Sequence, residues 1–227
     1  MAPAQRIVLL AGASGLVGRE ILDGLLADDS VAAVHTLGRR ELPLSHPKLT
    51  QHVVDFRALP PLPHADELYL ALGTTIKVAG SQDAFRAVDY EANLAVARAA
   101  AASGATKTGV VSAMGANPRS PVFYNRVKGE TEEALAALGF ATLVIARPSF
   151  LAGNREALGQ LVRGGEKLAL RISEALRPLI PRNYASIAAK DVAAALLQAV
   201  PARVGRHVLL SGAMQGAGGR AVTARSR

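Results

Sequence analysis

A glycine-rich turn near the start of the chain constrains the fold more than any other feature. Residues 12–18 read Gly-Ala-Ser-Gly-Leu-Val-Gly, after an apolar stretch at 6–11 and overlapping an amphipathic stretch at 16–26. The apolar run is typical of a buried strand, and the amphipathic run is typical of a helix. Glycine at positions 12 and 15 permits a tight turn, and Gly18 lets the helix pack against the sheet. The segment therefore predicts a strand–turn–helix unit whose helix amino end can receive phosphate groups.

The rest of the chain repeats the alternation of strand and helix. Further strands are expected at 33–37, 50–55, 67–72, 108–112, 141–146 and 206–210, and helices at 83–103, 124–138 and 191–200. This alternation predicts an α/β fold with a doubly wound parallel sheet, covered by helices on both faces. Since the carboxyl ends of parallel strands share one edge, we expect a ligand crevice along that edge.

The regular pattern ends after Pro148, which suggests how the domain is organised. We expect one domain over 1–211, within which about 151–190 forms a small helical substrate or lid region. Residues 212–227 are rich in Gly, Ala and Arg. Such a composition predicts a disordered basic tail.

Composition excludes several kinds of site and partner. The chain has no cysteine, which rules out disulfides and thiolate metal sites, and its five histidines lack the spacing of metal ligands. The net charge is +8, but no dense Lys/Arg stripe interleaved with aromatics is present, so we expect no nucleic-acid partner. A secretory signal pattern is absent, and no apolar run reaches the roughly 18 residues of a membrane span. We therefore expect a cytoplasmic protein with no membrane partner.

The end of the second strand selects between the two nicotinamide dinucleotides. A carboxylate at this point would bind the ribose 2′-hydroxyl of NAD, but the sequence reads Leu37-Gly38-Arg39-Arg40. Two guanidinium groups suit a 2′-phosphate, so we expect NADP(H) in preference to NAD(H). Asp55, at the end of the third strand, could reach the adenine, although a surface turn explains it nearly as well. Together with Arg39, Arg40 and Asp55, the expected cofactor-binding residues here are Gly12, Ser14, Gly15, Leu16, Val17 and Gly18.

Three residues form a candidate catalytic set. Ser112 ends the fifth predicted strand, and Tyr124 and Lys128 follow at a spacing of i, i+4 on one face of a helix. An ammonium beside a phenol stabilises the phenolate, so Tyr124 can act as general acid or base toward a carbonyl or alcohol. Ser112 can hydrogen-bond the same substrate oxygen, and Lys128 can also hold the nicotinamide ribose. Hydride transfer itself would belong to the cofactor.

With these motifs in place, the chain resembles the atypical and extended branch of the short-chain dehydrogenase/reductase superfamily, and within it the TIP30-like group. The resemblance covers roughly residues 6–200. It is carried by 12–18, Leu72-Gly73-Thr74-Thr75, Val88-Asp89-Tyr90, Ser112, Tyr124 to Lys128, Arg147-Pro148 and Asp191-Val192-Ala193. It implies an NAD(P)-binding Rossmann fold.

The resemblance also assigns roles beyond those that follow from the residues. It implies that Leu72, Gly73 and Thr74 lie along the cofactor and Pro148 near the nicotinamide, and it leaves a homodimer open. Many superfamily enzymes carry an Asn in the long helix that takes part in a proton relay. Asp89 stands at that position here, and Asn93 lies one helical turn on.

Two main functions are consistent with this pattern. The first is an NADP(H)-dependent oxidoreductase acting on a small carbonyl or alcohol, with Tyr124 as general acid/base. The second is a catalytically weak regulatory protein that senses NADPH, as some members of the group are. A sugar-nucleotide epimerase or dehydratase is less favoured, because those enzymes generally carry a larger C-terminal substrate domain than the part of this chain that follows residue 146.

Overall fold

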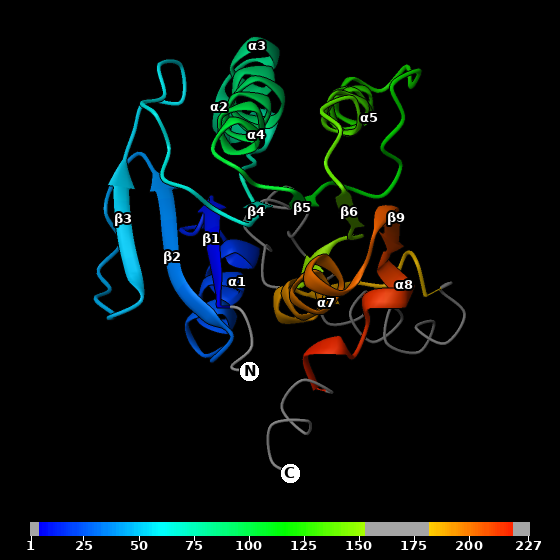
Figure 1. Cartoon of the computed structure of the whole chain (residues 1–227). Helices are drawn as coiled ribbons and strands as arrows, with labels where there is room; N and C mark the ends of the chain where they lie inside the picture. The colour runs from blue at the N-terminus through cyan, green and yellow to red at the C-terminus, as the bar shows by residue number, and fades with distance from the viewer. Residues whose placement is uncertain (1–4, 153–181, 220–227) are drawn as a thin grey trace.

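A seven-stranded parallel sheet organises the protein, as seen in a computed structural model that describes residues 5–152 and 182–219 (Figure 1). The strands lie in the order β3-β2-β1-β4-β5-β6-β9. Their bounds are β1 Arg6–Ala11, β2 Val31–Gly38, β3 Leu49–Val53, β4 Glu67–Leu70, β5 Lys107–Val111, β6 Thr142–Arg147 and β9 Gly205–Leu210. The order reverses between β1 and β4, which is where an open α/β sheet forms its ligand crevice.

Helices cover both faces of the sheet. On one face lie α1 (Leu16–Leu26) and α7 (Ala189–Ala202), packed on each other and on the sheet (Figure 1). The other face carries α2 (Ile76–Ala79), α3 (Gln82–Arg86), the π-helical turn η1 (Ala87–Ala92), α4 (Asn93–Ala102) and α5 (Phe123–Ala136). The predicted doubly wound α/β fold is confirmed.

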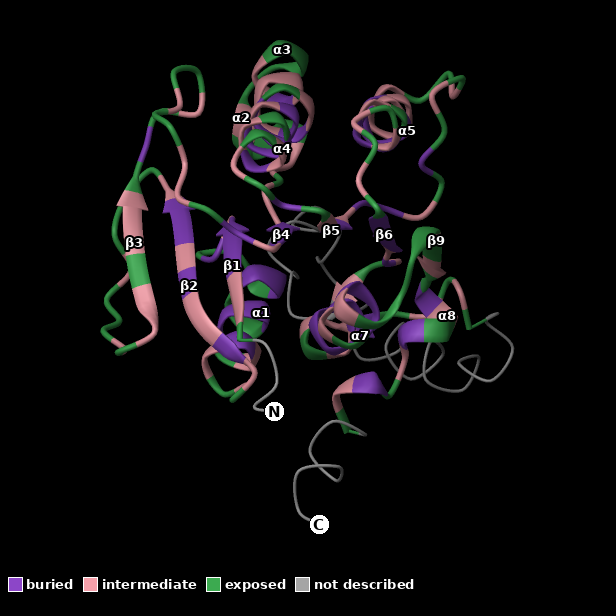
Figure 2. Ribbon diagram, in the orientation of Figure 1, coloured by how far each residue is buried: buried purple, intermediate pink, exposed green. Residues whose placement is uncertain are grey.

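Alternation along the strands explains why two cores form. In β1, Val8 and Leu10 pack under α1 and α7, whereas Leu9 and Ala11 pack under α4 and its neighbours. A strand sends successive side chains to opposite faces, so a central strand must be apolar at nearly every position. Figure 2 shows the buried residues concentrated on the central strands, while the edge strands β3 and β9 are largely half-buried or exposed.

Three features differ from or add to the sequence expectations. The helix expected at 83–103 is interrupted, because residues 87–92 form the π-helical turn. The disordered tail was predicted to begin at residue 212, which is too early in the chain. Residues Ser211–Met214 form α8, and Met214 and Ala217 are buried against the core around α7. Burial of these two apolar side chains accounts for their order. Most of the expected lid region, 153–181, lies outside the described residues, and its described ends form the two-stranded sheet of β7 (Leu151–Ala152) and β8 (Ile187–Ala188).

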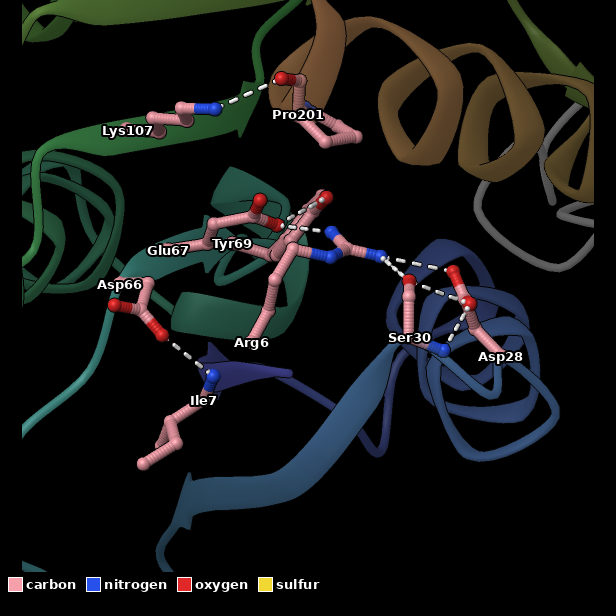
Figure 3. Close-up of polar contacts among 9 residues, drawn as sticks. All are labelled: Arg6, Ile7, Asp28, Ser30, Asp66, Glu67, Tyr69, Lys107 and Pro201. Carbon is pink, nitrogen blue, oxygen red and sulfur yellow. Dashed lines mark hydrogen bonds and ion pairs between the residues drawn. The ribbon is translucent and has the colours of Figure 1, made fainter. Parts of the chain in front are cut away.

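A charged network ties the amino ends of the central strands together (Figure 3). Arg6, which opens β1, donates to the buried Glu67 of β4 at 2.7 Å and to Asp28 at 2.8 Å. The Tyr69 hydroxyl also donates to Glu67, at 3.2 Å. Burial, followed by the Glu67 charge, raises the pKa of Tyr69 well above its ordinary value. This network lies at the opposite end of the strands from the expected crevice. In the part of the chain that the structure describes, no helix is long and apolar enough to cross a membrane.

Candidate functional site

The glycine turn lies between the end of β1 and the start of α1, pressed against the residues that follow β4. Gly12 has a positive φ of 91°, and a methyl group on it would lie 2.5 Å from the carbonyl carbon of Ala71. A methyl group on Gly18 would lie 2.1 Å from the Gly12 carbonyl oxygen. Both contacts are with backbone, which cannot move aside. The turn therefore accepts only glycine at both positions, because it packs closely against the protein's own backbone.

The amino end of α1 opens into a hollow. Its N-cap, Gly15, provides no side-chain hydrogen bond, so no side chain of the turn satisfies the first helical N–H groups. The hollow has a volume of about 440 Å³ and is lined by Ser14, Gly15, Leu16, Arg19, Glu20, Ala188, Ala189 and Lys190. Backbone donors, a helix amino end and two cationic side chains suit a pyrophosphate. The residues present thus fit the phosphate part of a dinucleotide.

The two arginines expected to select the dinucleotide lie just beyond β2. Arg39 and Arg40 are exposed, and among the described residues neither forms a hydrogen bond or ion pair. Both guanidinium groups are therefore available to an anionic ligand. Asp55 is exposed as well, and its Oδ1 accepts from the backbone N–H of Arg57 at 2.9 Å. This contact gives Asp55 a role in its own turn.

The loop after β4 lies over a buried ion pair. The Lys128 Nζ is 2.6 Å from Oδ1 of Asp89, and the two side chains are 8% and 0% exposed. The other carboxylate oxygen of Asp89 accepts from the backbone N–H of Thr74 at 2.9 Å. Burial lowers the pKa of Lys128, but Asp89, with smaller contributions from Tyr124 and Glu132, more than offsets this and raises it above its ordinary value. Lys128 is therefore a stable cation whose charge is balanced by Asp89.

Tyr124 lies one turn before Lys128 on α5. Its ring is half-buried and packs against Phe85 of α3, with 5.4 Å between the ring centroids. Among the described residues its hydroxyl forms no hydrogen bond, so the phenol is free to meet a ligand. Tyr124 and Lys128 stand at i and i+4 on α5, the spacing that places two side chains on one face of a helix.

The hydroxyl of Ser112 forms a hydrogen bond with another protein side chain, that of Glu132. The hydroxyl donates to Oε1 of Glu132 at 2.5 Å, and both side chains are buried. The same carboxylate accepts from Arg147 at Oε1 (3.0 Å) and Oε2 (2.5 Å). The hydrogen bond with Glu132 raises the pKa of Arg147 above its ordinary value. Since a hydroxyl has one proton to donate, Ser112 in this state cannot also donate to a substrate oxygen. Pro148, next to Arg147, is buried, and its carbonyl oxygen accepts from the N–H of Met114 at 2.9 Å.

Two residues that complete this site, Asp89 and Glu132, were not predicted from the sequence. Asp89 was noted only as a replacement for the usual Asn, and its contact with Lys128 was not foreseen. Glu132 was not singled out at all, although it follows Lys128 by four residues on the same helix face. This spacing, on a helix that already carried two predicted catalytic residues, was the sequence signal that could have identified Glu132.

Comparison with known proteins places the chain in a family. No protein-family model matches it. It is 38% identical over 161 residues to the protein fmp52, mitochondrial, of Emericella nidulans, a match that covers 66% of this chain and 68% of that protein. The chain belongs to the FMP52 family. A relative in Candida glabrata, FMP52, is 34% identical over 157 residues, covering 67% and 66% of the two chains.

This family membership corrects one expectation and supports another. The relatives are named as mitochondrial proteins, which contradicts the expectation of a cytoplasmic protein. That expectation was drawn only from the lack of a secretory signal and of a membrane span, and neither absence excludes a mitochondrial protein. The predicted resemblance to the short-chain dehydrogenase/reductase superfamily is confirmed.

Solved structures share the fold at low sequence identity. A short chain dehydrogenase family protein from Francisella tularensis subsp. tularensis SCHU S4 aligns with a TM-score of 0.66 and 13% identity, over 92% of this chain and 99% of its own. An oxidoreductase of the short chain dehydrogenase/reductase family from Burkholderia thailandensis aligns with a TM-score of 0.65 and 18% identity, over 98% of each chain. MoeE5 in complex with UDP-glucose and NAD has a TM-score of 0.66 and 18% identity, over 89% of this chain and 74% of its own.

Proposed function

We propose that this FMP52-family chain binds NADP(H) at the edge of the sheet where β1 and β4 end. The observation that supports this most directly is the glycine turn, closed to side chains at Gly12 and Gly18 and leading into a helix with no side-chain cap. The hollow beside it would receive the pyrophosphate. Arg39 and Arg40, exposed and without protein partners in the described chain, would hold the 2′-phosphate. Gly73 and Thr74 would lie along the dinucleotide.

With the dinucleotide bound, we propose an oxidoreductase that acts on a small carbonyl or alcohol. The nicotinamide supplies hydride transfer. Tyr124, whose hydroxyl has no partner among the described residues, exchanges the proton at the substrate oxygen. Lys128 keeps its charge and holds the ribose hydroxyls beside the phenol. Ser112 does not donate to the substrate oxygen while its only proton is engaged by Glu132, so Tyr124 carries the proton transfer.

A second candidate function is a regulatory protein that senses NADPH and turns over substrate weakly. Two contacts favour it. The ammonium of Lys128 is balanced by Asp89, and the proton of Ser112 is taken up by Glu132. Both contacts reduce what these side chains can contribute to stabilising charge on a substrate oxygen, whereas neither weakens the proposed binding of the dinucleotide.

Titration calorimetry of the wild-type protein with NADPH and NADH tests the binding proposal. A double variant Arg39→Ala/Arg40→Ala should bind NADPH at least about tenfold more weakly, since a charge-assisted hydrogen bond contributes about 1.5–3 kcal/mol. Its affinity for NADH should change by less than about threefold, because NADH has no 2′-phosphate. Arg98→Ala, which removes an exposed arginine of α4, is the matched control. No heat with either dinucleotide in folded wild-type protein would refute the proposal.

Turnover separates the two candidate functions. NADPH oxidation is followed against a panel of aldehydes and ketones, with the wild-type protein and with Tyr124→Phe. The oxidoreductase requires a wild-type rate that falls by a factor of about 10² or more when the phenol hydroxyl is removed. Equal rates for the two proteins would remove Tyr124 from the mechanism. Tight NADPH binding without turnover on the panel would favour the regulatory function.

A further inference from the structure

The backbone of Asp89, as well as its side chain, is in contact with polar groups of other residues. It belongs to the π-helical turn η1 and is fully buried. Its carbonyl oxygen accepts from Nδ2 of Asn93 at 3.0 Å. It also lies 3.1 Å from Oγ1 of Thr131 on α5, whose single proton it shares with the Val127 carbonyl at 2.8 Å. A π-helical turn interrupts the regular i to i−4 hydrogen bonds of an α-helix. The carbonyl of Asp89 in this turn is met by these two side chains instead. The position of Asp89 is thus fixed relative to α5.

The carboxylate of Asp89 joins two elements that line the proposed crevice. One oxygen lies 2.6 Å from the Lys128 Nζ of α5, and the other accepts from the backbone N–H of Thr74, in the loop after β4. A methyl group on Gly73 would lie 3.5 Å from Asp89 Oδ1 and 3.8 Å from Lys128 Nζ. The ion pair therefore lies directly beneath the backbone of Gly73, with no side chain between them.

The charged and titratable groups that face Lys128 leave Asp89 as its counter-ion. Asp89 faces it from η1, and Tyr124 and Glu132 face it from α5. Glu132 is already bound through both oxygens by Arg147 of β6. An ammonium has three N–H donors, and Lys128 meets Asp89 Oδ1 as an ion pair whose geometry is not that of a hydrogen bond. These donors remain available to hydroxyl groups of a ligand.

We propose that Asp89 is a positioning residue for dinucleotide binding, which fixes the charged Lys128 ammonium and the Leu72–Thr75 loop in the arrangement that receives the nicotinamide ribose. This inference rests on the proposed function. Asp89 acts through Lys128 and through the Thr74 N–H and does not contact the dinucleotide itself. Its carboxylate takes the place of a neutral amide, so this chain supplies Lys128 with a direct counter-ion.

This role makes a prediction that a purely structural role does not. A buried ammonium without a counter-ion gives up its proton more readily, because burial favours the neutral amine. In Asp89→Asn, the amide can still accept from the Thr74 N–H but cannot balance Lys128. Binding of the dinucleotide should then weaken as the pH rises and Lys128 becomes neutral. In the wild-type protein, Lys128 stays charged and affinity should be nearly independent of pH.

The experiment is titration calorimetry with NADP⁺ at several values between pH 7 and pH 9. The proteins are the full-length wild type, Asp89→Asn, Lys128→Met and the double variant. Asp83→Asn, at an exposed position of α3, is the control for removing a carboxylate from the same helical segment. We expect the wild-type and control affinities to change by less than about twofold over this range. We expect Asp89→Asn to lose about tenfold or more across it, the effect of losing one charged hydrogen bond.

The variants also separate this inference from the proposed function. Lys128→Met should bind weakly at every pH, and the double variant should match it, because Asp89 acts chiefly through Lys128. If Asp89→Asn does not fold, the match between the double variant and Lys128→Met still decides the matter. An Asp89→Asn profile as flat as that of the wild type, or a double variant more than about tenfold weaker than Lys128→Met, would overturn the inference alone. Wild-type protein that binds neither NADP⁺ nor NAD⁺ would overturn the proposed function and this inference with it.

Discussion

Two adjacent glutamates on α5 should differ sharply in their contribution to stability. Glu132 is buried and binds Ser112 and Arg147, whereas Glu133 is exposed. Replacing Glu132 by Ala leaves a buried hydroxyl without its acceptor and a guanidinium without its counter-ion. Both groups lose a partner that water replaces only in part, since the Arg147 side chain is 25% exposed and Ser112 is 6% exposed.

The size of the effect follows from these contacts. An unsatisfied buried hydroxyl costs about 1–3 kcal/mol. Breaking a buried ion pair by removing one partner costs about 3–5 kcal/mol, and the partial exposure of Arg147 places this pair at the lower end. We expect Glu132→Ala to lower the free energy of unfolding by about 4 kcal/mol or more. For a domain of this size that corresponds to a fall in Tm of about 8–16 °C.

Urea denaturation and thermal melts followed by circular dichroism measure the difference directly. Glu133→Ala is the matched control and should stay within about 0.5 kcal/mol of the wild type. The double variant Glu132→Ala/Arg147→Ala should be more stable than the sum of the single effects implies, because the Arg147 cation that loses its counter-ion is removed as well. If Glu132→Ala costs no more than Glu133→Ala, the buried network described here does not exist in solution.

Two further predictions concern the glycine turn and a histidine pair. Gly18→Ala places a methyl group 2.1 Å from the Gly12 carbonyl oxygen, so it should weaken NADPH binding in calorimetry by at least about tenfold. Gly219→Ala, where a methyl group would meet no atom within 4 Å, should bind like the wild type, and equal affinities for both variants would contradict the proposed turn. Burial, followed by the neighbouring His52, lowers the pKa of His35 below its ordinary value of 6.5. As the pH falls through this value, the unfolded chain therefore binds more protons than the folded protein, and the free energy of unfolding decreases. His35→Asn should therefore make the loss of stability between pH 7 and pH 5 shallower in urea melts, and a slope equal to that of the wild type would refute the assignment.

Most of the fold was predictable because its signals are local. The period of apolar residues marks each strand and helix, and α1 begins and ends at the predicted residues because the glycine turn and the apolar face of the helix are both contiguous in sequence. The parallel order of the strands also followed, since a strand–helix–strand unit has one favoured hand. The π-helical turn at 87–92 was not predictable, because it depends on Asn93 and Thr131 reaching its backbone in the folded protein.

The candidate site likewise combines residues that the sequence predicts with contacts that form only in the folded protein. The sequence alone singled out Tyr124 and Lys128 on α5 and the two arginines after β2 as candidate site residues. Only the tertiary structure decided which buried charge meets which. It paired Lys128 with Asp89, and it brought the Ser112 hydroxyl and the Arg147 guanidinium to the same carboxylate, that of Glu132. The physical reason is that a buried ion must find a counter-ion within hydrogen-bond distance, and that distance is set by how separate helices pack on the sheet, which no spacing along the chain records.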